Sequence, residues 1–409
     1  MAPQPKTRGM RILFLAPQPF FVERGTPIAV RLAVEALCRA GHKVDLLVFH
    51  GGEDIAVSGL TIYRAARPPM VTCVPIGLSA PKLACDAFLV AAAIGHLIKR
   101  RYDIVHAVEE AVFPALFLKM LRRFKLVYDM DSLLSDQIAE KWPRMGVFRP
   151  LLARLERWPM RRADLILPVC AAIAERVATQ APGQTIHVLP DAPPPVPAAG
   201  ESAQVMNLRA LVGGLRPIAL YVGNLERYQG VDLLLAAMQH VPEQCCSLVI
   251  VGGSDREVAA AVGAVRRLAI ADRVHLAGAA PLTHLPQLLE QADILCSPRI
   301  SGVNTPMKLY AYMQAGRAIM ATAIRSHTQV LSDTEACLVD PDDRAMAAGL
   351  VRLASDASLR TKLGEAARRT AENYSLPAYE KRLREAYATL DPPKRGRGRF
   401  LLAASGAGK

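Results

Sequence analysis

The residues best suited to chemistry lie close together between positions 297 and 316, in the sequence SPRISGVNTPMKLYAYMQAG. An apolar run ending at Ser297 predicts a buried strand, and the residues from 307 onward predict a helix that ends at Gly316. Between them, a tight loop is predicted that contains Gly302, Asn304 and Thr305. Unpaired backbone N–H groups and the helix dipole at such a junction attract anions, and Lys308 is one turn inside the helix. The stretch therefore predicts a phosphate-binding loop.

Two sets of alternating strands and helices are predicted to position this loop. Apolar runs in the first half occupy residues 11–16, 43–49, 103–107, 126–128, 164–168 and 186–189. Those in the second half occupy residues 218–223, 247–252, 274–277, 294–297 and 318–321. Helical sequence separates the runs, which is typical of parallel sheets. We therefore predict an α/β fold of two tandem doubly wound, Rossmann-like domains, with ligands at the carboxyl ends of the strands and in the cleft between the domains.

The proline-rich segment 190–200 marks the boundary between the two domains, because its composition differs from that of its surroundings. A second change of composition occurs near the C-terminus, where the sequence becomes basic and rich in glycine. The predicted divisions are an N-terminal domain at 1–195, a linker at 196–215, a C-terminal domain at 216–375, a helix at 376–392 and a basic flexible tail at 393–409.

Charge and composition narrow the class of ligand. The 409 residues include 50 Lys and Arg against 37 Asp and Glu, a net charge of +13 that favours anions such as phosphates or acidic lipid headgroups. Only 5% of residues are aromatic and no zinc-finger or RNP sequence is present, so we expect no nucleic-acid partner. Eight scattered cysteines are typical of free thiols in a reducing cytoplasm. The apolar stretch 83–98, interrupted by Asp86 and His96, is judged too short to span a membrane.

Six segments, in order along the chain, resemble motifs of the family 4 glycosyltransferases. They are RAGHKV at 39–44, DIVH at 103–106, ADLIL at 163–167, YVGNL with QGVDLL at 221–234, ADILCSP at 292–298 and the helix at 306–316. The resemblance implies the GT-B fold, with an acceptor-side first domain, a nucleotide-sugar-binding second domain and a last helix that packs back on the first domain. It also implies retaining transfer of a sugar from a nucleotide-diphosphate sugar to a glycan or lipid-linked acceptor in envelope, exopolysaccharide or glycolipid synthesis, with no further cofactor.

The resemblance and the anion-attracting positions together give a set of candidate site residues. The candidate catalytic residues are His106, Glu109 and Asp131. The candidate donor-binding residues are Gly25, Thr26, Gly223, Asn224, Arg227, Gln229, Arg299, Gly302, Asn304, Thr305, Lys308 and Leu309. No metal site is predicted: Asp129 and Asp131 form a DxD sequence, but they follow a strand of the first domain.

The sequence departs from the family pattern at four donor-site positions. Asn224 and Gln229 stand where an Arg and a Lys usually hold the donor diphosphate, and Val303 and Ala311 stand where two glutamates are usual. Amide groups still hydrogen-bond to oxygen, with less Coulomb attraction. Backbone N–H groups, Arg227, Arg299 and Lys308 would then have to supply more of the donor binding.

Structural alternatives stay open for individual residues. Lys308 could be a solvated helix residue, His106 a hydrogen-bonded core histidine and Asp131 a helix cap, whereas His327 could contact the donor. For the whole chain, the alternatives are a catalytically silent GT-B binding domain and a sugar-nucleotide epimerase, which would need acidic and histidine residues in the cleft. An oxidoreductase is disfavoured because no GxGxxG follows the first strand.

The segments 83–101 and 147–162 mix apolar residues with Lys and Arg. They could be ordinary helices with one buried face, or a surface that docks on anionic lipid. We therefore expect a cytoplasmic protein that could bind peripherally to the inner face of the cell membrane.

Overall fold

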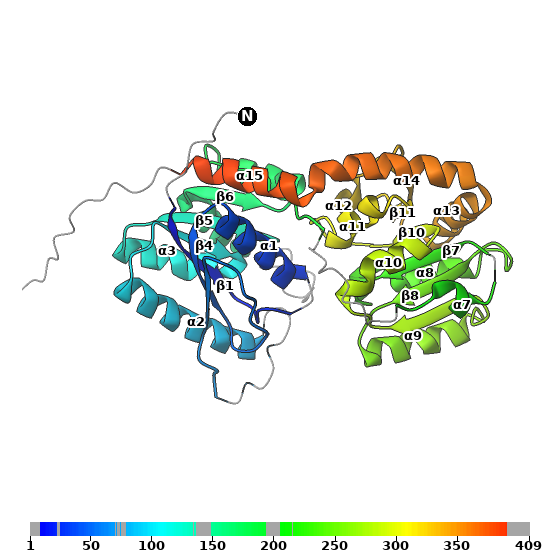
Figure 1. The fold of residues 1–409 in the computed structure, drawn as a ribbon, viewed down its shortest axis with the longest axis horizontal. Coiled ribbons are helices and arrows are strands. Elements are labelled where there is room, and N and C mark those ends of the chain that lie inside the picture. Colours follow the sequence, from blue (N-terminus) through cyan, green and yellow to red (C-terminus); the bar gives the residue numbers. More distant parts are fainter. Residues whose placement is uncertain are drawn as a thin grey trace, which may run out of the picture.

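The computed structural model describes residues 9–22, 25–69, 71, 74, 79–133, 135, 149–193, 205–214 and 216–390. Two parallel six-stranded sheets form two domains that lie side by side in Figure 1, with strand orders β3-β2-β1-β4-β5-β6 and β12-β11-β10-β7-β8-β9. The predicted α/β class, with two tandem doubly wound domains, is confirmed. The predicted flexible tail and the first nine residues of the predicted linker lie outside the described residues.

The N-terminal sheet is covered by helices on both faces. Its strands are β1 (Arg11–Ala16), β2 (Lys43–Val48), β3 (Leu60–Arg64), β4 (Ile104–Val108), β5 (Lys125–Met130) and β6 (Leu165–Pro168). Its helices are α1 (Gly25–Arg39), α2 (Ala80–Lys99), α3 (Val112–Leu121), α5 (Arg149–Arg162) and α6 (Ala171–Gln180). α2, α3, α5 and α6 share one core cluster with the sheet, and α1 packs into a second cluster on the opposite face. The strand predicted at 186–189 is a single bridge between Ile166 and Ile186.

The C-terminal sheet follows the same plan. Its strands are β7 (Ile218–Val222), β8 (Ser247–Val251), β9 (Val274–Gly278), β10 (Ile294–Ser297), β11 (Ala318–Thr322) and β12 (Ala336–Val339). Its helices are α7 (Leu208–Val212), α8 (Val231–Met238), α9 (Asp255–Arg267), α10 (Leu285–Gln291), α11 (Met307–Ala315), α12 (Arg325–Thr328), α13 (Asp343–Ser355) and α14 (Ala357–Ala371). α7 falls within the predicted linker, but its Leu208 is fully buried in the core of this domain.

The last described helix, α15 (Leu376–Ala388), returns to the N-terminal domain (Figure 1). The backbone is extended at Ser375 (ψ 158°), which separates α15 from α14, and Pro377 occupies the first turn of α15, where its missing N–H costs nothing. Tyr379, Leu383 and Tyr387 then pack into the same core cluster as α1 and β1. An ion pair of 2.7 Å between Arg39 and Glu380 links α15 to α1. The N-terminal domain therefore completes its core with residues from the far end of the described chain.

Helix α2 differs from the sequence expectation in length. Its 20 residues extend beyond the apolar stretch 83–98 at both ends, and at the N-terminal end Ser79 caps the helix by accepting a hydrogen bond from the Lys82 N–H. Among the described residues, it is the one helix long and apolar enough to cross a membrane by length and composition alone. Only 22% of its most apolar window is buried. The length of α2 therefore does not exclude that it spans a membrane, and the contacts of α2 with the rest of the domain have to be considered.

Candidate functional site

The loop between β10 and α11 is wrapped around the side chain of Arg299, which is only 7% exposed. The guanidinium donates hydrogen bonds to the Ser301 carbonyl (2.7 Å), the Asn304 carbonyl (2.9 Å) and the Asn304 side-chain oxygen (2.9 Å). Gly302 has a φ of +106°, and a Cβ there would lie 2.3 Å from a guanidinium nitrogen. The loop needs glycine both for its backbone conformation and for the space that the arginine occupies.

Lys308, in the first turn of α11, places its amino group below this loop. The stem is partly exposed, but Nζ is buried and has no hydrogen-bond partner among the described residues. It lies 3.9 Å from the centre of the Tyr221 ring, and a Cβ at Gly223 would be 3.2 Å from it. Burial, together with the nearby charge of Arg299, lowers the pKa of Lys308 well below its usual range. Because a buried amine without a partner is costly, an anion bound at the end of β7 would satisfy it.

The predicted donor-binding residues after β7 lie beside this loop. The Tyr221 hydroxyl donates to the Asn224 carbonyl (2.5 Å), and the Ile300 N–H donates to the Tyr228 carbonyl (3.0 Å). Asn224 and Arg227 are exposed, whereas Gln229 is 8% exposed and its Oε1 has no hydrogen-bond partner among the described residues. The structure therefore brings the segment 223–229 and the β10–α11 loop together, although nearly 70 residues separate them in sequence.

Two residues predicted to bind the donor are already engaged within the protein. Leu309 is fully buried in the core, and its N–H donates to the Pro306 carbonyl (2.9 Å), so this prediction is corrected: neither group is free to meet a ligand. Thr305 is 3% exposed, and its hydroxyl accepts a hydrogen bond from Gln329 (2.9 Å). The side-chain oxygen (Oε1) of Gln329 in turn accepts from the N–H of Ala172 in the N-terminal domain (3.2 Å). Thr305 thus helps to fix the loop at the domain boundary.

His327 is also a structural residue. Its ring is fully buried, 2.8 Å from the Ser297 hydroxyl on one side and 2.8 Å from the Thr322 carbonyl on the other. Burial lowers the pKa of His327 to about 4, so the ring is neutral near pH 7. It joins the ends of β10 and β11 beneath the loop, and the alternative that it contacts the donor directly is not supported by this geometry.

Carboxylates gather on the N-terminal side of the boundary, where β4 and β5 end. Glu109 has a φ of +48°, uncommon for a residue with a Cβ, and accepts a hydrogen bond from the Ser132 hydroxyl (2.8 Å). Burial and the charges of Asp129, Glu109 and Asp191 raise the pKa of Asp131 well above its usual range. Burial and Asp129 raise the pKa of Asp191 to about 7. The predicted Glu109 and Asp131 are therefore neighbours, and the structure adds Asp129 and Asp191 to them.

The acidic group faces the C-terminal domain. Burial and then the charge of Asp191 raise the pKa of Tyr310, a residue of α11. Val303, at the tip of the β10–α11 loop, packs against the N-terminal core, and its carbonyl accepts from the Cys170 thiol (3.7 Å). The described residues contain no group of three His, Cys, Asp or Glu side chains arranged to hold a metal ion. Carboxylates of the N-terminal domain thus lie near Tyr310 of α11, the helix that also carries Lys308.

His106, the third predicted catalytic residue, does not reach this boundary. Its side chain is fully buried and stacks on Phe14 with a centroid distance of 4.0 Å. One ring nitrogen lies 3.0 Å from Asp129 Oδ2, and the other lies 2.7 Å from the Tyr387 hydroxyl of α15. The prediction of direct catalytic contact is therefore corrected: a ring with no exposed surface cannot touch a substrate, and His106 instead holds Asp129 in place.

Gly25 and Thr26 form the first turn of α1, whose N-terminal end points toward the C-terminal domain in Figure 1. Gly25 is exposed, Thr26 is partly exposed, and no acidic residue occupies this turn. Met307, the first residue of α11, packs against the core cluster that contains Ile28 of α1. Two helix N-termini, each favourable for an anion, therefore approach the same part of the domain boundary.

Comparison with known proteins identifies related sequences and folds. Residues 24–192 match the family described as "Glycosyl transferase 4-like domain", and residues 216–356 match "Glycosyl transferases group 1". A D-inositol 3-phosphate glycosyltransferase of Xylanimonas cellulosilytica is 27% identical over 217 residues, which are 50% of this chain and 51% of that protein. The chain spans about half the length of the curated relatives that it matches.

Solved structures resemble nearly the whole chain. Sucrose-phosphate synthase from Thermosynechococcus elongatus has a TM-score of 0.78 at 20% identity, covering 93% of this chain and 98% of the other. The Anabaena protein HepE in complex with UDP-glucose has a TM-score of 0.71 at 16% identity, covering 93% and 100%. At these identities the likeness concerns the fold, and it confirms the predicted GT-B arrangement.

Proposed function

Since this chain belongs to the group 1 glycosyltransferase family, we propose that it transfers a sugar, with retention of configuration, from a nucleotide-diphosphate sugar to a glycan or lipid-linked acceptor. The observation that carries the proposal is the buried amino group of Lys308, which lacks a hydrogen-bond partner among the described residues and lies beside a loop hydrogen-bonded to Arg299. A diphosphate between the domains would supply the missing partner. The family match and the UDP-glucose complex of HepE support a donor of this class.

In this proposal, Lys308 and Arg299 stabilise the nucleotide diphosphate as the leaving group. Negative charge develops on the leaving phosphate as the bond to the sugar breaks, and preorganised donors stabilise that charge more than they stabilise the intact donor. A diphosphate that reaches the buried Lys308 amino group would accept a hydrogen bond from it. Arg299 uses its N–H groups on loop oxygens, so it contributes charge and a fixed loop shape. Because these two residues supply positive charge, the proposal includes no metal ion or further cofactor.

The acidic group on the N-terminal side suits an acceptor that carries hydroxyl groups. Glu109 and Asp129 can accept hydrogen bonds from sugar hydroxyls, and a protonated Asp131 can also donate one. The negative charge that remains on this side would repel the donor diphosphate, which favours its binding near Lys308. We therefore assign the donor phosphates to the C-terminal domain and the acceptor hydroxyls to the N-terminal domain, in a cytoplasmic reaction of polysaccharide or glycolipid synthesis.

The first test is a donor screen with the purified full chain. UDP-, GDP- and ADP-sugars are compared by thermal shift, and the stabilising donor is then incubated with glycan and lipid-linked acceptors and analysed for product by mass spectrometry. Stabilisation by one donor, with sugar transferred to an acceptor, is the expected result. Configuration at the new linkage, read by NMR, tests retention separately.

A catalytically silent binding domain is the second candidate, because Asn224, Gln229, Val303 and Ala311 lack the charges usual in the resembling family. It predicts no thermal shift with any nucleotide sugar. The epimerase alternative would produce an isomerised nucleotide sugar without an acceptor, but it needs accessible histidines, and both His106 and His327 are fully buried.

A further inference from the structure

Helix α2 of the N-terminal domain carries apolar residues on its solvent-facing side as well as on the side that packs against the sheet. Every exposed residue of α2 except Lys99, at its C-terminal end, is apolar, including Leu83, Ile94 and Ile98. The opposite side of the same helix packs into the core. A helix that is apolar on two opposite sides is normally buried in protein or in lipid, and α2 packs against protein on one side only.

The neighbouring helices α3 and α5 extend this surface. The exposed residues of α3 are Phe117, Met120 and Leu121, with exposures of 59%, 80% and 76%. The Phe117 ring meets the ring of Trp158 on α5 at a centroid distance of 5.3 Å, which joins α3 to α5. Arg122 at the end of α3 donates to the Ile98 carbonyl (3.5 Å), which joins α3 to α2. We call the exposed residues of these three helices the α2–α3–α5 face.

Helix α5 places arginines next to its apolar residues. Leu151, Leu155 and Trp158 are spaced i, i+4 and i+7 and form one stripe, whereas Arg154, Arg157 and Arg161 form a second stripe about a quarter turn away. A shallow hollow of about 440 Å³ is lined by these arginines with Trp158 and Arg162.

No exposed acidic residue interrupts this arrangement on the three helices. Their acidic residues are Asp86, which is partly buried, and Glu156, which is 1% exposed and accepts hydrogen bonds from Ser135. The α2–α3–α5 face is therefore largely apolar, and the charged residues exposed on it are all basic.

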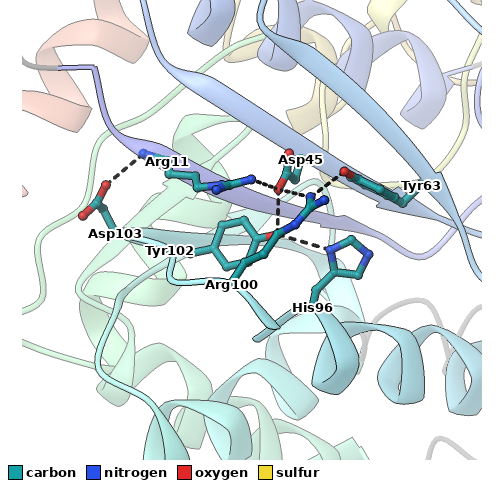
Figure 2. A network of polar contacts seen from close by, with 7 residues as sticks. All are labelled: Arg11, Asp45, Tyr63, His96, Arg100, Tyr102 and Asp103. Carbon is teal, nitrogen blue, oxygen red and sulfur yellow. Dashed lines mark hydrogen bonds and ion pairs between the residues drawn. The ribbon is translucent and has the colours of Figure 1, made fainter. Parts of the chain in front are cut away.

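Polar contacts fix α2 to the sheet at its C-terminal end (Figure 2). Arg100 donates to Asp45 Oδ2 (3.0 Å) and to the Tyr63 hydroxyl (2.5 Å), and the Tyr102 hydroxyl donates to the same Asp45 oxygen (2.7 Å). His96, still within the helix, lies 3.2 Å from the Tyr102 hydroxyl. A helix held in this way lies along the surface of the domain, so its exposed side can enter an interface while the helix itself does not cross a bilayer.

We propose that the α2–α3–α5 face docks on an anionic lipid bilayer. The exposed leucine, isoleucine and aromatic side chains enter the boundary between headgroups and acyl chains, and the arginines of α5 bind headgroup phosphates in the hollow that they line. Charge complementarity selects this occupant: the face carries arginine and no exposed acid, on a chain whose net charge is +13. Docking on lipid is independent of sugar transfer, and it would bring the protein to acceptors held in a membrane.

The direct test uses Trp158 as a reporter. The chain has two tryptophans, so Trp142→Phe leaves Trp158 as the single fluorophore. Vesicles of equal parts phosphatidylcholine and phosphatidylglycerol, made with brominated acyl chains, should quench its emission at low salt, and pure phosphatidylcholine vesicles should not. Binding of anionic vesicles without quenching would overturn the proposal, as would no binding at low salt.

Matched variants separate this face from general charge attraction. Arg154→Gln with Arg157→Gln and Arg161→Gln should weaken vesicle binding by about fivefold for each arginine removed. The control replaces three exposed arginines of α9, Arg256, Arg266 and Arg267, by glutamine. An equal loss in both triple variants would mean that net charge alone attracts the protein, and would overturn the assignment to this face.

Two further measurements test other occupants. Light scattering would detect a dimer, and fluorescence in lipid-free solution would show whether Trp158 is shielded from solvent. A dimer in which Trp158 is shielded would make the face a subunit interface and overturn the proposal. Transfer to a soluble acceptor without vesicles should be the same in the α5 triple variant as in wild type. Loss of lipid binding and loss of transfer are therefore distinguishable outcomes.

Discussion

The two sides of the domain boundary carry opposite charges and stabilise them in different ways. On the C-terminal side, Arg299 is bonded to its own loop, and Lys308 has a buried amine with no hydrogen-bond partner in the described chain. On the N-terminal side, several carboxyl groups lie close together, and burial and the neighbouring negative charges raise the pKa values of Asp131 and Asp191. The C-terminal side is therefore prepared for an anion from outside, whereas the N-terminal side reduces its own charge by binding protons.

The largest effect is expected from Lys308→Met, which keeps the bulk of the side chain and removes its charge. Binding of a nucleotide diphosphate should weaken by about 2 kcal/mol, or roughly thirtyfold, because a charge-assisted hydrogen bond is lost. The unliganded variant should be as stable as wild type or more stable, because a buried amine without a partner has been removed. Isothermal titration and thermal melts measure the two effects.

The matched control for this prediction is Lys362→Met, which removes an exposed charge from α14. It should leave nucleotide binding unchanged, and equal weakening in both variants would contradict the assignment. Because burial lowers the pKa of Lys308, an anion that raises this pKa should also cause proton uptake on binding. Titrations in buffers with different ionisation enthalpies would detect it.

A smaller loss is expected from Gly302→Ala. The added Cβ would lie 2.3 Å from the Arg299 guanidinium, at a φ of +106° that alanine disfavours. Stability should fall by about 1–2 kcal/mol, and nucleotide affinity should fall because the arginine must move. Gly263→Ala in α9 is the control: its Cβ would make only an ordinary contact of 3.7 Å, and this variant should gain up to about 1 kcal/mol in urea unfolding.

The acidic side predicts a dependence of stability on pH. The pKa of Asp191 is about 7 in the folded protein against an ordinary value of 3.8, so between these values the folded chain holds a proton that the unfolded chain has lost. The free energy of unfolding therefore falls as the pH rises from about 4 to about 7, because the folded protein must keep Asp191 protonated or bury its charge. Asp191→Asn should be more stable than wild type at pH 8 and equal to it at pH 4, whereas the exposed Asp340→Asn should show no such difference.

The smallest effect is expected from Tyr387→Phe, which removes the hydroxyl that contacts His106. Unfolding by urea should show a loss of about 1 kcal/mol, the usual contribution of one buried hydrogen bond. Nucleotide affinity should not change, since this pair lies behind Asp129 on the N-terminal side. A large drop in affinity would show that the two sides are coupled more tightly than their separate hydrogen bonds indicate.

The sequence located the fold better than it located the site. The apolar runs predicted β1 and β10 at the bounds that the structure shows, because parallel strands buried on both faces are continuously apolar. The short edge strand β3 was missed, because its exposed and partly buried residues give no such run. Gly316 ends α11 in the left-handed conformation, as expected from a glycine after a helical pattern.

The errors at the site share one physical reason. On a strand or helix buried on more than one side, sequence does not tell which way a given side chain points, so His106 and Leu309 were both assigned to a ligand and both lie in the core. The environment of Lys308 depends on Tyr221 and Gly223, which tertiary packing brings near it. Asp191 lies in the proline-rich segment that was interpreted only as a boundary, and no local pattern marked it.

The return of α15 to the first domain has a consequence for how the chain is made. Tyr379, Leu383 and Tyr387 belong to the same core as β1 and α1, yet ribosomes synthesise them only after the whole of the C-terminal sheet. During translation the face of the N-terminal sheet that α15 will cover stays open, next to other nascent apolar surface. Synthesis of this protein therefore includes an interval in which β1 to α6 of the first domain have emerged but the helix that completes their core has not been made, and chaperones that shield apolar surface would act in that interval.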